Sequence, residues 1–418
     1  MKNNYLMIGL FMLIFFVLSF LTNIIGPLVP DIIESFNLSL TLVAFLPFAF
    51  FIAYGVMSIP SGMLVERIGA KKVMVLAFLI SFLGALGFAW KPSYALYLVS
   101  LFFIGTGMAM LQVAINPLLR VAGGEKNFAF NSVLGQLFFG LASFLSPLAY
   151  SYLVLNIGTQ AANSNWLIST LSGLVPESLP WISLYWVFAI VSLLMVLVIA
   201  MIRFPKEQLE EDEKVGALQT HLDLLKKPMV ILYFFGIFAY VGTEQGVANW
   251  ISKFLQTYHD VDPQLEGAST VSLFWGLMTA GTVLGLILLK FVDSRKVLIG
   301  FSAAAIVALA LGLLGSKPIA MLAFPMVGFF ASVMWSIIIS LALNSVASHH
   351  GSFSGILVTA IAGGAIVPLV VGWLGDIFGL KIGLFFLFIT LAYILSIGFW
   401  SKPLINNETI SMKNAETA

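Results

Sequence analysis

The sequence predicts an all-α polytopic membrane protein with twelve transmembrane helices in two pseudo-symmetric six-helix halves. Hydrophobic residues make up 60% of the chain and charged residues only 9%, with a mean hydropathy of +1.03, whereas soluble chains carry about 25% charged residues. Charge-free runs long enough to cross a bilayer as helices, about 20 residues each, recur along the whole chain. The most highly charged connection falls near the middle and separates these runs into two equal sets.

The apolar runs give the twelve expected spans in order. The first run follows Lys2 and resembles a secretory signal, but it is too long and no small-residue cleavage site follows, so we expect a retained helix. The uncharged region 318–375 is divided where small polar residues interrupt it, at 344–352. The spans are then 5–29, 41–65, 73–90, 95–119, 127–151, 180–202, 228–252, 268–289, 297–316, 319–343, 353–374 and 382–401.

The charged connection defines the domain boundaries. We expect a first six-helix half at 1–205, a cytoplasmic linker at 206–226, a second half at 227–401 and a cytoplasmic tail at 402–418. An internal repeat supports two halves. ERIGAKKVMV follows the second span and KFVDSRKVLI follows the eighth, so that Lys71 and Lys72 align with Arg295 and Lys296.

Positive charge predicts the orientation of the spans. Sixteen of the 20 Lys and Arg residues fall on the side of the membrane that carries both termini, and cytoplasmic connections are the ones enriched in these residues. We therefore expect both termini in the cytoplasm.

Composition also excludes several functions. A net charge of +1 without a basic patch argues against nucleic-acid binding. The chain has no cysteine, and its four histidines lie in connecting segments without metal-ligand spacing, so we expect no metal site. Because no nucleophile–base pair or phosphate-binding loop occurs at workable spacing, we expect no enzyme.

An acidic residue, Glu244, lies in the middle of the seventh span, within YVGTEQGVANW. A carboxylate at that depth is costly, so intramembrane acids are functional candidates. Gln245 lies next to it, and Asn249, four residues further on, shares a helix face with Gln245. A permanently protonated Glu244 that only bonds a neighbouring helix would look the same in sequence, so a binding role and a structural role both remain open.

Polar residues in other spans are candidates for the same site. Gln112, Asn116 and Arg120 recur every four residues and form one polar ladder on the fourth span. Amides facing a cavity could bind a polyol, whereas amides facing another helix would be interhelical hydrogen-bonding groups. The further candidates are Asn23 and Gln136, with Trp275 and Trp335 as aromatic surfaces inside their spans.

The segment SGMLVERIGAKK, residues 61–72, resembles the major facilitator motif in the loop between spans two and three. The resemblance implies a cytoplasmic gate whose charges bond the opposite half in one conformation only. Arg120 lies near the same end of the fourth span and is assigned to this gate. The motif residues are Gly62, Glu66, Arg67, Gly69, Lys71 and Lys72.

A second motif is more specific. QVAINP followed by GGEK, residues 112–126, is similar to the corresponding sequence of the fucose:proton symporter family, a sugar-transporting branch of the major facilitators. GPLVP in the first span, YVGTEQGVANW, and the eighth and eleventh spans extend the resemblance over most of the membrane part. It implies an alternating-access transporter that takes up a monosaccharide, usually together with a cation, in a bacterial inner membrane.

Two positions depart from that family. Gly26 stands where members commonly carry an acid, and Gln112 stands where proton-linked fucose carriers have a glutamate and glucose-type members more often a glutamine. Glu244 is then the remaining candidate for coupling. Proton symport, sodium symport and uncoupled facilitation all remain open.

We expect the substrate site between the two halves, with the bilayer and a neutral monosaccharide as the partners and a monomeric protein. No cofactor is expected beyond a coupling proton or sodium ion. An exporter of amphipathic drugs or lipids on the same fold is the main rival, and it would have a more apolar cavity. A non-transporting sensor would need an added cytoplasmic domain, for which the 17 residues after Ser401 are too few.

Overall fold

The computed structural model describes residues 5–123, 128–157, 166–202, 204, 218–346 and 350–404, and within these ranges it is built of helices. The first set of helices is α1 (Tyr5–Thr22), α2 (Ile25–Phe36), α3 (Leu40–Ile68), α4 (Ala70–Trp90), α5 (Tyr94–Gly123), α6 (Phe128–Ile157), α7 (Trp166–Ser172) and α8 (Ser183–Met201). The second is α9 (Leu218–Leu225), α10 (Pro228–Ala248), α11 (Ile251–His259), α12 (Ala268–Leu288), α13 (Ser294–Leu314), α14 (Lys317–Ala331), α15 (Met334–Leu343), α16 (His350–Thr359), α17 (Gly363–Phe378) and α18 (Leu380–Trp400). Short turns η2 (Pro180–Ile182), η4 (Pro263–Gly267) and η5 (Ala360–Ala362) join some of them.

Twelve helical segments of the described chain are long and apolar enough to cross a bilayer, which confirms the expected number of spans. Helices are the natural outcome for such runs, because a bilayer offers no water to the backbone and a helix satisfies its amides internally. Several boundaries differ by a few residues, among them the end of the fifth span, at Ile157 instead of 151, and the end of the first. The first span continues to Phe36, beyond the expected end at residue 29, so Asp31 lies inside a helical segment that its charge had been expected to end.

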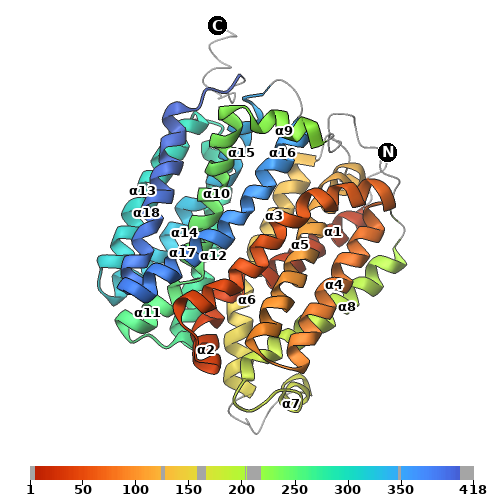
Figure 1. Ribbon diagram of the computed structural model, residues 1–418, viewed down its shortest axis with the longest axis vertical. Helices are drawn as coiled ribbons and strands as arrows, with labels where there is room; N and C mark the ends of the chain where they lie inside the picture. Colours follow the sequence, from red (N-terminus) through yellow and green to blue (C-terminus); the bar gives the residue numbers. More distant parts are fainter. Residues whose placement is uncertain are drawn as a thin grey trace.

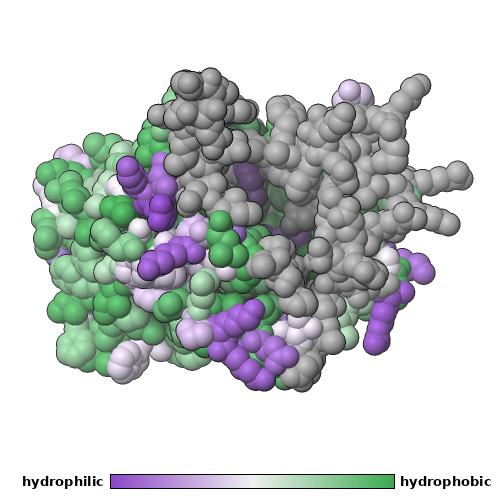
Figure 2. All heavy atoms as spheres, turned by 90° about the horizontal axis from the view of Figure 1, so that it is seen from above, coloured by the Kyte–Doolittle hydropathy of each residue, from purple (hydrophilic) through white to green (hydrophobic). Residues whose placement is uncertain are grey.

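The helices form two groups that lie side by side in Figure 1, with α1–α8 in one and α10–α18 in the other. We call the upper end in this view, where α9 and the junction of α3 and α4 lie, the α9 face. The lower end, where α2, α7 and α11 lie, is the α11 face. Seen from above in Figure 2, hydrophilic side chains lie across the α9 face, while hydrophobic side chains dominate the flank at the left of the view.

The most extensive contacts between the groups are those of α3 with α17 and of α6 with α12. Glycines allow both contacts to be close. A Cβ built on Gly372 of α17 would lie 2.6 Å from the carbonyl oxygen of Leu40, and one built on Gly140 of α6 would lie 2.0 Å from Oγ1 of Thr279. A larger residue at either glycine would therefore separate the groups.

At the α11 face a further contact closes the space between the groups. Helix α2 packs against α11, and a Cβ on Gly26 would lie 2.3 Å from the carbonyl oxygen of Ala248. Because that oxygen belongs to the backbone, only glycine fits here in this conformation. The acid that the family resemblance leads one to expect at position 26 would therefore not fit in this conformation.

Several spans are broken near their middle. The first changes direction at Asn23–Ile24 between α1 and α2, the tenth at Ser332–Val333 between α14 and α15, and the eleventh at η5. Discontinuous membrane helices are tolerated where irregular backbone lines a cavity, and in transporters they mark substrate sites. The breaks therefore indicate where a site lies.

The expected linker and tail are only partly described. Helix α9 occupies the end of the linker and contacts α10 and α16, whereas 205–217 and 405–418 lie outside the described residues. The proposed domain boundaries remain a prediction.

Candidate binding cavity

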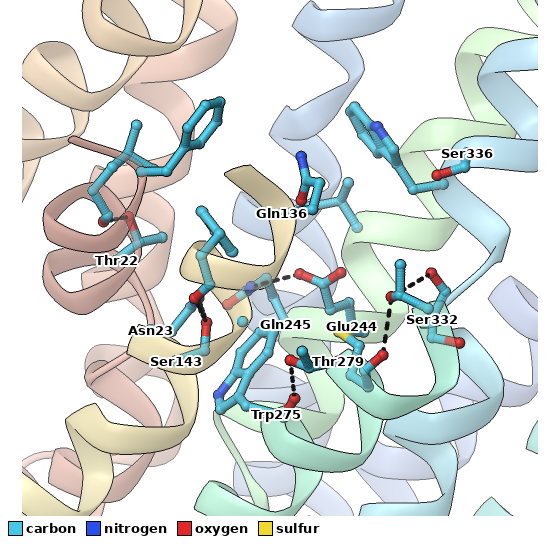
Figure 3. A pocket seen from close by; sticks show the side chains of 18 of the residues that line it. Thr22, Asn23, Gln136, Ser143, Glu244, Gln245, Trp275, Thr279, Ser332 and Ser336 are labelled. Carbon is cyan, nitrogen blue, oxygen red and sulfur yellow. Dashed lines mark hydrogen bonds between the residues drawn. The ribbon is translucent and has the colours of Figure 1, made fainter. Parts of the chain in front are cut away.

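A cavity of about 420 Å³ lies between the two helix groups, with walls from α1, α3, α5 and α6 on one side and α10, α12, α15 and η5 on the other. This volume is within the range of about 300–1,000 Å³ that is typical of small-molecule sites. Figure 3 shows its labelled polar side chains converging from both groups. The predicted candidates that line it are Asn23, Gln112, Gln136, Glu244, Gln245, Trp275 and Trp335.

Glu244 lines the cavity from α10 and is held by two neighbours on the same helix. The hydroxyl of Tyr240, one turn earlier, donates to Oε2 at 2.5 Å. Nε2 of Gln245 donates to Oε1 at 3.1 Å. The carboxyl group therefore has hydrogen-bond donors from its own half, and no basic side chain occurs among the described residues that line the cavity.

Two amides on the opposite wall are free. Gln112 of α5 and Gln136 of α6 both line the cavity, and neither side chain forms a hydrogen bond within the described part of the chain. Each amide offers two N–H donors and a carbonyl acceptor. A ligand with hydroxyl groups, which both donate and accept, could use all of these groups.

Asn23 lies at the deep end of the cavity, at the break between α1 and α2. Its Nδ2 donates to Oγ of Ser143 at 2.9 Å and to Oγ of Ser19 at 3.4 Å, and the two serine oxygens are 2.6 Å apart. This network joins α1 to α6 within one half. It gives Asn23 a structural role in addition to its place in the wall.

Aromatic rings cover part of the second wall. Trp335 packs against Tyr240 with ring centroids 6.0 Å apart, and Trp275 packs edge-on against Phe274 at 5.1 Å. Flat apolar surfaces beside polar groups suit ligands with alternating C–H and hydroxyl groups, as sugars have.

Hydroxyl groups of the second half also line the cavity and were not predicted from the sequence. Thr279 and Thr282 of α12 donate to the carbonyls of Trp275 and Met278 at 2.9 and 3.0 Å, and Ser332 lies at the break beyond them. Since each threonine hydrogen is used within its own helix, its oxygen can act only as an acceptor toward a ligand. Threonines and serines recur throughout the spans, so their sequence positions alone carried no signal.

The cavity opens toward the α9 face. Toward that face its lining residues are exposed: Gln136 is exposed and Leu286 is 41% exposed. Toward the α11 face they are buried, as Asn23 and Trp275 are. The contacts of α2 with α10 and α11 close the opposite end.

Asn249 is a described candidate that does not line the cavity. It lies at the end of α10, buried beside Gly26, where a Cβ added to the glycine would be 3.3 Å from Cα of Asn249. Its Nδ2 and the indole nitrogen of the next residue, Trp250, are buried without a hydrogen-bond partner in the described structure. Both residues therefore belong to the closed end of the molecule rather than to the wall of the cavity.

The residues predicted to form a gate lie at the α9 face. Arg67 and Lys72 are exposed, Gly62 is buried in α3, and Gly69 ends that helix with φ 84°. Nζ of Lys71 donates to the carbonyl of Ala200 at 2.8 Å, at the end of α8 in the same half. The described side chains of this motif thus form no hydrogen bond or ion pair with the second half, as an open α9 face requires.

Three candidates lie outside what the structure describes at side-chain level. The side chains of Glu66, Asn116 and Arg120 belong to this group, although the backbone of each is helical. Their predicted roles remain predictions. No group of metal-ligating side chains occurs among the described residues.

Comparison with known proteins identifies the family. The family model of the Major Facilitator Superfamily matches residues 11–368. A glucose/galactose transporter of Brucella abortus (biovar 1, strain 9-941) is 32% identical over 395 residues, which cover 91% of this chain and 90% of the relative. The L-fucose-proton symporter of Escherichia coli K12 is 24% identical over 389 residues, covering 88% of this chain and 86% of the relative.

Solved structures agree on the fold. A crystal structure of the E. coli fucose:proton symporter, FucP, superposes with a TM-score of 0.68 at 21% identity, over 96% of this chain and 99% of that one. A bacterial homologue of the human lysosomal transporter Spinster, in an inward-facing and unoccupied conformation, gives a TM-score of 0.79 at 16% identity, over 95% and 96% of the two chains. Twelve spans, a cavity between two helix groups and these matches lead to one conclusion: the chain belongs to the Major Facilitator Superfamily, and it is an integral membrane transporter rather than an enzyme.

Proposed function

We propose that the protein takes up a neutral monosaccharide by alternating access, with Glu244 as the group that couples transport to a proton or a sodium ion. The observation that carries this proposal is the cavity itself, which combines free amides from one half with a carboxyl group and aromatic rings from the other. The relatives that cover most of the chain are named as glucose/galactose and fucose carriers.

The polarity of the lining supports a neutral, hydroxylated solute. Gln112 and Gln136 can donate to and accept from the same ligand, whereas the threonine oxygens of α12 only accept. Among the lining residues whose side chains the structure describes, Glu244 is the single charged group, so an organic anion would meet repulsion from it. The amides also argue against an exporter of amphipathic drugs, whose cavity would be more apolar.

Coupling follows from the cost of an intramembrane charge. A carboxylate is expensive inside a membrane unless it is protonated, paired or wetted, so loading Glu244 with a proton or sodium ion favours movement of the closed carrier. Uncoupled facilitation is the second candidate. It is favoured by the hydrogen bonds from Tyr240 and Gln245, which could hold Glu244 as a purely structural group.

The orientation that we propose places the α9 face in the cytoplasm of a bacterial cell and the α11 face outside. Arg67 and Lys72 beside α3, and Arg295 and Lys296 at the start of α13, lie at the α9 face, as the positive-inside rule requires. In this orientation the cavity opens inward, so the structure represents the state that releases substrate.

The test is uptake of radiolabelled glucose, galactose and fucose into proteoliposomes with an imposed proton or sodium gradient. Wild type is compared with Glu244→Gln and with Glu266→Gln. Glu266 is a matched control because it is a carboxylate of the same half that pairs with Lys317 at 2.9 Å, away from the cavity.

The proposal predicts accumulation above equilibrium driven by one of the two ions. This accumulation is lost in Glu244→Gln, while exchange of sugar across the membrane is retained, and Glu266→Gln behaves as wild type. Uptake that never exceeds equilibrium and is equal in all three proteins would identify a facilitator. No uptake of any of the three sugars, with the protein folded, would refute the proposed substrate class.

A further inference from the structure

The junction between α17 and α18 repeats the sequence pattern of the junction between α3 and α4. The segments GMLVERIGAK (62–71) and GWLGDIFGLK (372–381) share a glycine, a leucine, an acid, a second glycine and a lysine at identical spacing. Asp376 thus stands where the first segment has Glu66. The first segment lies at the α9 face and the second at the α11 face.

The backbones of the two junctions are also alike. Gly69 has φ 84° and ψ 148°, and Gly379 has φ 91° and ψ 147°. Each glycine N–H donates to the carbonyl four residues earlier at 2.9 Å, and each glycine directly precedes the next helix. These positive φ angles favour glycine, so the same turn is built twice, once at each face.

Asp376 uses this turn to bond the other half of the molecule. Its Oδ1 accepts from the backbone N–H of Leu40 at 2.8 Å, and its Oδ2 accepts from the N–H of Thr41 at 2.8 Å. These residues begin α3, where the side chain of the cap residue Ser39 accepts from the N–H of Leu42 at 3.2 Å. The carboxylate therefore satisfies two helix N-terminal donors that the first half leaves free, where the helix dipole also favours a negative charge.

Close packing allows this bond to form. Gly372 lies one turn before Asp376 on α17 and faces the start of α3, where a Cβ added to it would meet the Leu40 carbonyl oxygen at 2.6 Å. Ala44, one turn further along α3, is 1% exposed, and its own Cβ would lie 3.0 Å from the Cβ added to Gly372. Separation of α3 from α17 would expose Ala44 and break both bonds to Asp376.

We propose that Asp376 holds the α11 face closed by capping α3 across the two halves, and that the α17–α18 junction is the counterpart at this face of the α3–α4 motif. In the present state Lys71, a described residue of the motif at the α9 face, bonds within its own half, while Asp376 at the α11 face bonds across. When the α11 face opens, Asp376 would lose both of its bonds to α3 of the other half.

The absence of cysteine from the chain makes a direct test possible. Ala44→Cys is introduced as a reporter, and its rate of reaction with a maleimide is measured on purified protein in nanodiscs, where both faces are accessible. Loss of capping bonds of this kind changes an equilibrium constant, here the ratio of molecules with the α11 face closed to molecules with it open, roughly tenfold. We therefore expect Asp376→Ala to accelerate labelling about tenfold, and Asp376→Asn, which keeps one acceptor, to accelerate it less.

Asp262 provides the matched control. It is also a carboxylate at the α11 face that caps backbone N–H groups, those of Gln264 and Leu265 at 2.8 and 3.2 Å, but it caps them within its own half. Asp262→Ala should leave labelling of Ala44→Cys unchanged.

Three results would overturn the assignment. The first is labelling at the wild-type rate in both Asp376 variants, and the second is equal acceleration by Asp262→Ala. The third uses another reporter, Ala305→Cys, which is fully buried in α13 away from the interface; equal acceleration there would indicate loss of the fold instead of opening. None of these readouts depends on the identity of the substrate, so the outcome is independent of the proposed sugar transport.

Discussion

Replacement of Gly26 by alanine should open the α11 face of this transporter. The new Cβ would lie 2.3 Å from the carbonyl oxygen of Ala248, 3.1 Å from the carbon of the same carbonyl and 3.3 Å from Cα of Asn249. All three atoms belong to the backbone, so no side-chain rotation can relieve the contact. Helix α2 must then move away from the end of α10.

The size of the effect follows from this overlap. Overpacking of a tight contact costs about 1–3 kcal/mol, and about 1.4 kcal/mol changes an equilibrium tenfold. The contact exists only while the α11 face is closed, so its cost falls on that state. The ratio of closed to open molecules should therefore fall by roughly 5- to 150-fold.

This ratio can be measured by pulsed electron paramagnetic resonance on a pair of nitroxide labels. Trp90 at the end of α4 and Ile319 in α14 are 77% and 45% exposed and belong to different halves at the α11 face. Labels at these positions should report a longer-distance population in Gly26→Ala. Gly9→Ala is the control, because nothing lies within 4 Å of a Cβ added there. Identical distance distributions in the two variants would refute the reasoning.

Three further changes test other parts of the structure. Gly363→Ala places a Cβ 2.0 Å from a backbone oxygen of α10 and should lower the melting temperature, whereas Gly300→Ala, with nothing within 4 Å, should not. Gln112→Leu removes an amide with no partner in the described chain, so we expect sugar affinity to fall roughly 2- to 10-fold with an unchanged melting temperature; a stability loss without an affinity loss would contradict this. Burial, and after it two nearby lysines, lower the pKa of His259 from 6.5, so the folded state binds this proton less tightly than the unfolded chain. The melting temperature should fall as the pH drops below about 6.5, and this part of the decline should be absent in His259→Gln.

Sequence reasoning worked best where one physical rule decides the outcome. Apolar length, with the small polar residues at 344–352 as a break, predicted twelve spans, because a helix of that length satisfies its own backbone in a bilayer. It failed at boundaries set by packing. The charge of Asp31 predicts that the first span ends before it, yet α2 continues past it, with its carboxylate accepting from Tyr150 at 2.7 Å and from Gln264 at 3.3 Å. Those partners come from distant parts of the chain.

For the candidate site, too, some residues lie where the sequence predicts and one does not. Glu244, Gln112 and Gln136 stood out because such groups are costly in a bilayer, and all three line the cavity. Asn249 is predicted for the site because it shares a helix face with Gln245. Helical spacing predicts direction around the axis but not depth along it, and Asn249 lies one turn deeper, covered by α2.

The closed end of the molecule also bears on how fast it can work. Buried there without partners in the described structure are the Asn249 amide nitrogen and the Trp250 indole nitrogen, and each such donor raises the energy of the state that buries it by about 1–3 kcal/mol. A seal in which every polar group were satisfied would make closure deep and reopening slow. These two unsatisfied donors disfavour the closed end, in opposition to the capping bonds of Asp376 that favour it. If the protein works by alternating access as proposed, this opposition bears on its turnover rather than on its affinity.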